Sequence, residues 1–194
     1  MDPLAFYLQV GFKHIADLAA YDHLLFLIAL CAVYRLEQWR SIAILVTAFT
    51  IGHSITLALA ALDTVRISSS LIEFLIPTTI LITALLNVVR APSESVRANM
   101  GPNYALALFF GLIHGMGFSN YFRALLMDES SILVPLVGFN LGIELGQLMI
   151  VAVIIALAYV FLNVLSVKHR DWNVFVSGGA AALALQLMLA NQFW

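Results

Sequence analysis

Long apolar runs make up most of the chain, and short polar segments separate them. None of these runs alternates apolar and polar residues as a half-buried strand does, so each predicts a helix. A helix needs about 20 mostly apolar residues to cross a bilayer, where only helices or closed barrels satisfy the backbone. We therefore expect six membrane-spanning helices, at about residues 21–36, 41–62, 70–90, 103–126, 131–165 and 172–194.

The segment before the first span is more mixed and predicts a short amphipathic helix, either continuous with that span or separate from it. Pro77 is a candidate for a kink in the third span. The fifth run is long enough for one tilted helix, or for a helix preceded by a short interfacial segment. The predicted fold is thus an all-α integral membrane bundle, with residues 1–194 forming a single transmembrane domain.

Composition supports this fold class, because 62% of the 194 residues are hydrophobic and only 10% are charged. A soluble domain is about half apolar and about a quarter charged. The net charge of −2 provides no basic surface, which argues against a nucleic-acid partner. The one cysteine, Cys31, excludes a cysteine-based zinc knuckle. The N-terminal residues carry no basic leader, so we expect no removable signal peptide.

Basic residues are distributed unequally between the two ends of the predicted spans. One end carries Arg35, Arg40, Arg90, Arg97, Lys168 and Arg170, and the other carries Lys13, Arg66 and Arg123. Because cytoplasmic loops collect Lys and Arg, both termini are expected outside, in a multi-pass protein of a bacterial-type inner membrane. Trp39, Trp172 and Trp194 lie near predicted helix ends, as in an aromatic belt.

The sequence shows no clear internal repeat. The pairs Gly52-His53 and His114-Gly115 are too short to establish one. An inverted-repeat architecture, which is common in transporters, is left open.

Four ionisable residues lie inside four different apolar runs: His23, His53, His114 and Glu144. Such groups are costly in the membrane interior and are usually functional. Imidazoles and carboxylates that converge from several helices form the ligand set of a divalent metal ion, with imidazole favouring the later first-row metals.

Three further ionisable residues, His14, Asp17 and Asp22, precede His23 near the mouth of the first span. His14 and Asp17 are three residues apart, so they share a helix face, and the carboxylate is a candidate for orienting the imidazole. Asp22 is adjacent to His23 and is either a metal ligand or a helix cap. For the cluster as a whole we favour a functional role.

The second and fourth spans combine a histidine with glycines. Gly52 permits close helix approach beside His53, and Ser54 follows as a helix-to-helix hydrogen-bonding group. His114 is surrounded by glycines that allow backbone proximity, a helix break or room for an ion. In both spans the alternative is packing, with each histidine satisfied by a neighbouring polar group.

The fifth span has a polar stripe formed by Asn140, Glu144 and Gln147, at i, i+4 and i+7. A buried carboxylate must be protonated, paired or metal-bound. Glu144 is therefore a metal ligand or a proton carrier, whereas Asn140 and Gln147 are equally well explained as a polar lock between helices.

These motifs together resemble the HupE/UreJ family of small membrane proteins. The segments that carry the resemblance are HIAD (14–17), YDHLLF (21–26), FTIGHSITLA (49–58), GLIHGMGF (111–118) and GIELGQ (142–147). That family is regarded as nickel or cobalt permeases associated with metalloenzyme maturation. The resemblance therefore implies nickel or cobalt as cargo and His14, Asp22 and His23 as the family's His…Asp-His signature. A metalloenzyme-maturation partner or a homo-oligomer is also compatible with it.

Three functional hypotheses follow. In the first, the chain is a divalent-metal permease with ligands His14, Asp22, His23, His53, His114 and Glu144, supported by Asp17, Ser54, Asn140 and Gln147. In the second, the same ligands hold zinc in an intramembrane hydrolase acting on a lipid or a peptide, with Glu144 or Asp22 as general base. The third is a membrane-complex subunit that needs no metal. We favour the permease.

Overall fold

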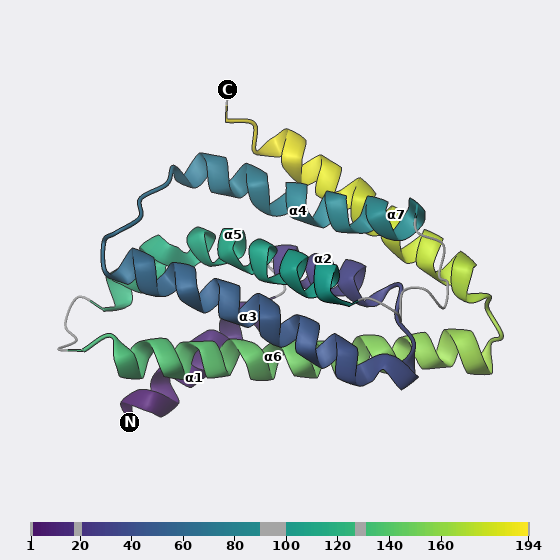
Figure 1. Cartoon of the computed structure of the whole chain (residues 1–194), viewed down its shortest axis with the longest axis horizontal. Coiled ribbons are helices and arrows are strands. Elements are labelled where there is room, and N and C mark those ends of the chain that lie inside the picture. The colour runs from purple at the N-terminus through teal and green to yellow at the C-terminus, as the bar shows by residue number, and fades with distance from the viewer. Residues whose placement is uncertain (1, 18–20, 90–99, 127–130, 194) are drawn as a thin grey trace.

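The computed structural model describes residues 2–17, 21–89, 100–126 and 131–193, which form an all-helical bundle (Figure 1). Its α-helices are α1 (Pro3–Ala16), α2 (Tyr21–Cys31), α3 (Trp39–Ala61), α4 (Ser69–Val89), α5 (Gly101–Leu125), α6 (Leu133–Tyr159) and α7 (His169–Ala190). A short 3-10 turn, Leu36–Gln38, precedes α3, and a π turn, Val160–Val164, extends α6. The fifth apolar run is thus one long helix.

The predicted all-α membrane bundle is confirmed. The helices α3 to α7 are each long and apolar enough to cross a membrane, and α1 and α2 together would provide a sixth span with a bend of 69°. The first span therefore differs from the expected continuous helix over residues 21–36. With 11 residues, α2 is about 16 Å long, roughly half the thickness of the hydrocarbon layer. Arg90, Arg97 and Trp194 lie outside the described residues.

Two helix pairs pack with their backbones in close contact: α1 against α6, and α3 against α5 (Figure 1). A Cβ added to Gly52 would lie 2.1 Å from the carbonyl oxygen of Leu108, and one on Gly142 would lie 2.1 Å from that of Leu8. Only glycine permits this approach, so these positions confirm the expected glycine-mediated packing.

The third pair consists of α4 and α7, which run antiparallel along one side of the bundle (Figure 1). Helix α4 continues through Pro77, which lacks the N–H that would bond the carbonyl of Glu73. The side chain of Asn191, at the end of α7, donates to that carbonyl over 3.5 Å. A neighbouring helix thus supplies the donor that proline removes.

The outer faces of α6 and α7 are apolar and exposed. On α6 these side chains include Leu141, Leu145, Met149, Val153 and Leu157. Such a surface is expected for helices whose outer side is solvated by lipid. The interior contains two clusters of buried apolar side chains, one extending over α2 to α7 and one where α1, α3, α5 and α6 meet. The candidate site lies where these clusters approach each other.

Candidate metal site

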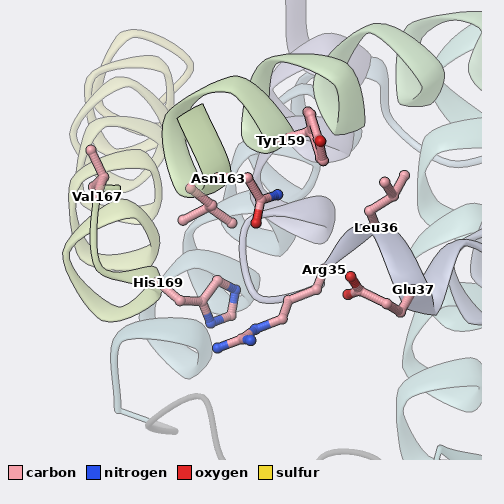
Figure 2. Close-up of a pocket in the computed structure, with 8 residues that line it drawn as sticks. Arg35, Leu36, Glu37, Tyr159, Asn163, Val167 and His169 are labelled. Atoms are coloured by element: carbon pink, nitrogen blue, oxygen red, sulfur yellow. The ribbon is translucent and has the colours of Figure 1, made fainter. Parts of the chain in front are cut away.

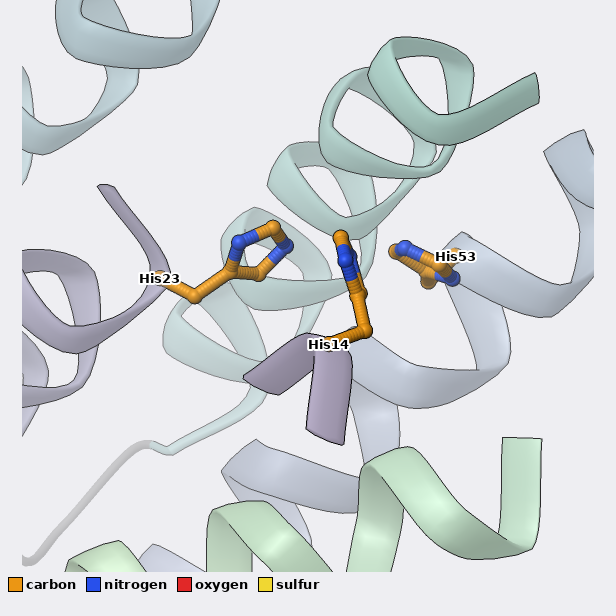
Figure 3. Close-up of side chains that lie close together, drawn as sticks. All are labelled: His14, His23 and His53. Atoms are coloured by element: carbon orange, nitrogen blue, oxygen red, sulfur yellow. The ribbon is translucent and has the colours of Figure 1, made fainter. Parts of the chain in front are cut away.

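Three imidazoles from three helices meet inside the bundle. His14 is in the last turn of α1, His23 in the first turn of α2, and His53 near the middle of α3. Each offers one nitrogen, and these three atoms all lie within 4.8 Å of one another. Figure 3 shows the ring of His14 between those of His23 and His53. We call this group the histidine triad.

The triad is formed because α1 ends where the chain turns into α2. This turn brings two histidines that are nine positions apart to within 4.9 Å, measured between the ring centroids of His14 and His23. His53 reaches the same place from α3, where its neighbour Gly52 contacts the backbone of α5. His23 and His53 are 4% and 0% exposed, so two members of the triad are fully inside the protein.

Every member of the triad has a ring nitrogen that no described residue satisfies. Nε2 of His14, Nε2 of His23 and both ring nitrogens of His53 are buried without a hydrogen-bond partner among the described residues. Buried polar atoms are normally hydrogen-bonded, because an unmade bond costs about 1–3 kcal/mol. The unpaired nitrogens on these three neighbouring residues form a set of ligand atoms that a metal ion could bind.

Asp22 orients His23. Its Oδ1 lies 3.1 Å from Nδ1 of His23 and accepts a hydrogen bond from the backbone N–H of the same residue over 2.9 Å. With the proton on Nδ1, His23 presents the lone pair of Nε2 to the triad. This is the usual relation between a carboxylate and a metal-binding histidine, and it fixes both tautomer and ring orientation.

His114 lies beside the triad on α5. Its ring centroid is 5.2 Å from that of His23, and it is 1% exposed. Nε2 of His114 lies 3.0 Å from Oγ1 of Thr79, whose hydroxyl donates to the carbonyl of Ile76 over 2.7 Å. If this hydroxyl accepts from Nε2–H, His114 keeps Nδ1 as its lone-pair nitrogen, and in the described part of the chain that atom is buried without a partner.

Thr79 is a residue that the sequence analysis missed. A threonine in an apolar helix usually bonds its own backbone, and the neighbouring Thr78 and Thr83 do so. No pattern in the sequence separates Thr79 from these two threonines, because none indicates which face of α4 meets α5.

Glu144 occupies a different environment from the histidines. Its Oε1 accepts from the hydroxyl of Thr47 over 2.6 Å, and its Oε2 lies 2.5 Å from the hydroxyl of Thr50. The same Thr50 hydroxyl lies 2.9 Å from Oε1 of Gln147, which is fully buried. The predicted stripe on α6 therefore faces two threonines of α3, and we call this group the α3–α6 polar contact.

Three other predicted residues lie around these two groups. The amide of Asn140 donates to the carbonyl of Leu136 over 2.7 Å, within its own helix. Ser54 donates to the carbonyl of Thr50 over 2.7 Å, within its own helix. Asp17 is the residue at which α1 ends. The roles expected for these residues stay predictions.

The triad is slightly wider than a bound metal site. Nitrogen–metal bonds of about 2.0–2.1 Å place two ligands of one tetrahedral ion about 3.4 Å apart. The upper separation of 4.8 Å therefore requires a closure of up to about 1.4 Å, which ring rotations can provide. The donors are all imidazole, a ligand that suits zinc, copper, iron and nickel.

A surface pocket lies at one end of the bundle, away from the triad. Figure 2 shows its lining, which includes Arg35, Glu37 and His169, at the junction between the segment before α3 and the end of α6. Its volume is about 120 Å³. His169 thus lies among charged side chains at an end of the bundle, apart from the other histidines.

The architecture defines a multi-pass helical membrane protein with a buried group of imidazoles that could bind a metal ion. Residues 1–192 match the family described as HupE / UreJ protein, so the chain belongs to the HupE/UreJ family. This confirms the resemblance that the motifs indicated. No curated protein and no solved structure matches the chain.

Proposed function

We propose that this protein is a permease for a divalent transition metal, nickel or cobalt, and that the histidine triad is its coordination site. The observation that carries the proposal is the set of buried ring nitrogens without partners on His14, His23 and His53, contributed by three helices. Packing alone would favour apolar side chains at these positions, since unsatisfied polar atoms destabilise the fold.

The metal is the substrate in this proposal. Asp22 holds His23 in the tautomer that binds the ion, and the ligands themselves are neutral imidazoles. His114 is the next donor along the bundle, 5.2 Å from His23 between ring centroids, and Thr79 orients it. We expect the ion to pass between the triad and His114. We do not include Glu144 among the ligands of this site, because its carboxylate is already hydrogen-bonded to Thr47 and Thr50.

The orientation follows from the charges at the helix ends. The ends at which α3 and α5 begin are near the larger group of basic residues, so this side is proposed to face the cytoplasm. Both termini then lie outside, and the metal moves inward. An accessibility assay with a membrane-impermeant thiol reagent on single cysteines in the two end regions would establish the sidedness.

The decisive experiment measures binding and uptake on the same purified protein. Cobalt and nickel binding in detergent and uptake into proteoliposomes are compared with those of His14→Ala and His53→Ala. We expect both variants to lose binding and uptake together. Uptake that is unchanged in both variants, or a protein that neither binds nor transports cobalt or nickel, would rule out the proposal.

The same measurements address the hydrolase hypothesis. A hydrolase would hold equimolar zinc tightly and would catalyse no uptake. Glu144, one of the two candidate bases for that reaction, is hydrogen-bonded to Thr47 and Thr50, and the other, Asp22, is hydrogen-bonded to His23. No observation on the described residues favours hydrolysis over transport.

A further inference from the structure

The two halves of the chain contain matching positions. An offset of 100 residues between α1 and α5 matches Gly11 with Gly111 and His14 with His114, and an offset of 90 residues between α3 and α6 matches Phe49 with Phe139 and Gly52 with Gly142. Further identities fall at the same offsets: Ala5 and Ala105, Leu8 and Leu108, Ile42 and Ile132. These identities are too scattered to be recognised in the sequence without the packing that relates them.

The matching glycines make matching contacts. A Cβ on Gly11 would lie 2.0 Å from the carbonyl oxygen of Phe139, and one on Gly111 would lie 2.1 Å from that of Phe49. The reverse contacts also match. Gly142 faces the carbonyl of Leu8, and its counterpart Gly52 faces the carbonyl of Leu108, which is the counterpart of Leu8. The pair α1 and α6 is therefore packed in the same way as the pair α5 and α3.

The matching helices run in opposite directions. Gly142 contacts Leu8 and Gly146 contacts Ile15, so α1 and α6 are parallel; in the same way, Gly52 contacts Leu108 and Gly115 contacts Thr56, so α3 and α5 are parallel. The two pairs point opposite ways in Figure 1. The third helices, α4 and α7, are also antiparallel to each other. An axis in the membrane plane thus relates the two halves, as in inverted-repeat transporters.

Each of the two corresponding histidines is covered by a pair of phenylalanines. The ring centroid of His14 is 4.0 Å from Phe118 and 5.8 Å from Phe139, and these two rings stack at 4.8 Å. We call them the α5–α6 aromatic pair. It joins a helix of one closely packed pair to a helix of the other.

The other corresponding histidine has the equivalent cover. The ring centroid of His114 is 5.3 Å from Phe26 and 5.1 Å from Phe49, and these two rings also stack at 4.8 Å. We call them the α2–α3 aromatic pair. Phe49 is the counterpart of Phe139, whereas Phe26 has no aligned counterpart and comes from α2, the segment that follows the bend after α1.

The two aromatic pairs lie on opposite sides of the histidines along the membrane normal. In α3, Phe49 is one turn before His53; in α5, which runs parallel to α3, Phe118 is one turn after His114. Both α3 and α5 are candidate membrane spans. Moving along their shared direction, one therefore meets the α2–α3 pair, then the histidines, then the α5–α6 pair.

We infer that the chain is an inverted repeat and that these two aromatic pairs are the gates that separate the histidine site from the two faces of the membrane. The gating role rests on the proposed transport function, and the repeat does not. Stacked apolar rings exclude water and hydrated ions from a narrow path. If helices α1 and α6 move away from α3 and α5, Phe118 separates from Phe139 and the α5–α6 aromatic pair opens. The α2–α3 aromatic pair opens when helix α2 moves away from helix α3.

The test locks each gate with a covalent bridge. In a Cys31→Ala background, one variant carries Phe118→Cys with Phe139→Cys, and another carries Phe26→Cys with Phe49→Cys. A short bifunctional thiol reagent bridges each pair, and a reducible linker allows its removal. We expect either bridge to reduce cobalt uptake into proteoliposomes at least tenfold, and reduction to restore the rate of the unbridged variant. Each protein is thus its own control for folding.

A matched control bridges two aromatic positions elsewhere. Phe74 and Phe193 are in ring contact at 5.2 Å and join α4 to the end of α7. The bridged variant Phe74→Cys with Phe193→Cys should transport cobalt at the rate of its unbridged form. Equal loss of uptake in this control would mean that any bridge stops the protein, and would overturn the assignment of gates.

The two locked variants should differ in the face from which the site is reached. Cobalt binding is measured in right-side-out and in inside-out membrane vesicles. We expect the variant locked at the α5–α6 pair to bind cobalt in one orientation only, and the variant locked at the α2–α3 pair to bind it in the opposite one. Binding of both in the same orientation, or undiminished uptake after bridging, would overturn the gates. If the unbridged protein binds no cobalt, the proposed function fails instead, while the repeat stands.

Discussion

The histidine triad and the α3–α6 polar contact both place ionisable side chains inside the bundle, and they differ in how those side chains are satisfied. The carboxylate of Glu144 accepts from two threonine hydroxyls, at 2.6 and 2.5 Å. Nε2 of His14, Nε2 of His23 and both ring nitrogens of His53 have no partner among the described residues. The carboxylate of Glu144 thus has its hydrogen bonds supplied by the protein, although Nε2 of the adjacent Gln147 does not, and the imidazoles leave lone pairs available.

This difference indicates which group is prepared for an ion. A carboxylate that is already solvated by hydroxyl groups stabilises the contact between α3 and α6 without a metal. Imidazoles without donors in a closed interior destabilise the fold until a ligand compensates. The chemical type of the residue does not distinguish a metal ligand from a group that joins two helices, since both imidazole and carboxylate bind metals. The distinction comes from whether neighbouring groups already satisfy the side chain by hydrogen bonds.

The largest expected effect is that of His23→Ala on metal affinity. Replacing the oriented imidazole removes a direct ligand, so affinity should fall by more than about 100-fold, given that loss of an outer partner already costs 10–100-fold. Calorimetry with cobalt in detergent measures the change. His169→Ala is the matched control, because His169 lines the separate end pocket. A similar decrease in the control would contradict the assignment.

Asp22→Asn should have a smaller effect on the same quantity. The amide keeps the size of the side chain but weakens the hold on Nδ1 of His23, so we expect affinity to fall about 10- to 100-fold. Because Asp22 acts through His23, the double variant Asp22→Asn with His23→Ala should bind no worse than His23→Ala. An additive loss in the double variant would instead make Asp22 a direct ligand.

Thr50→Val tests the contribution of the α3–α6 polar contact to stability. Valine preserves the shape but removes the hydroxyl that lies between Glu144 and Gln147. A hydrogen bond to a charged group contributes about 1.5–3 kcal/mol in water and about 0.6 kcal/mol on average between membrane helices. We expect a loss of about 1–2 kcal/mol in the free energy of unfolding in detergent.

The metal affinity should be unchanged by Thr50→Val and by Glu144→Gln. Thr47→Val, which removes only one hydrogen bond at the edge of the contact, serves as the milder control for stability. A hundredfold loss of cobalt affinity in Glu144→Gln would instead make Glu144 a ligand, and the two groups would then be parts of one site.

The smallest expected effect concerns Asp63, an exposed residue at the end of α3. Hydrogen bonding and charge from Arg66, together with the charge of Arg123, lower the pKa of its carboxyl. A lowered folded-state pKa contributes stability at neutral pH that is lost as the pH falls below about 4, the ordinary range for Asp. Thermal unfolding of Asp63→Asn should therefore depend less on pH in this range.

Asparagine is the suitable replacement because residue 63 has a φ of 56°, in the left-handed region that Asn tolerates. Metal affinity should not change in Asp63→Asn. A stability profile identical to that of the parent protein between pH 3 and pH 7 would show that the ion pair contributes nothing to the folded state.

The sequence predicted much of the fold from physical rules alone. Long apolar runs require helices in lipid, and this rule gave α3 to α7 with small errors at their ends. It failed at the first span, since hydropathy does not record the direction of a helix axis. The bend between α1 and α2, which places His14 next to His23, depends on packing against α4, α6 and α7.

The candidate site shows the same division. The residue types and the cost of burying them made His23, His53, His114 and Glu144 candidate ligands without any structure, and the spacing of His14 to Asp17 added His14 to them. Periodicity also placed Glu144 and Gln147 on one face of α6, and both face Thr50. It could not indicate that this face meets α3 at two threonines, nor that Thr79 contacts His114, because the contacts between helices are not encoded in the period of one helix.

By itself the sequence determined that this protein is a bundle of membrane helices with ionisable groups in its interior, because the solvation of backbone and charge depends on residue type and run length. Only the tertiary structure decided which of those groups share a site. Close approach at Gly11, Gly52, Gly111 and Gly142 sets the relative position of four helices, and that position leaves three imidazoles facing one another while Glu144 meets hydroxyl donors.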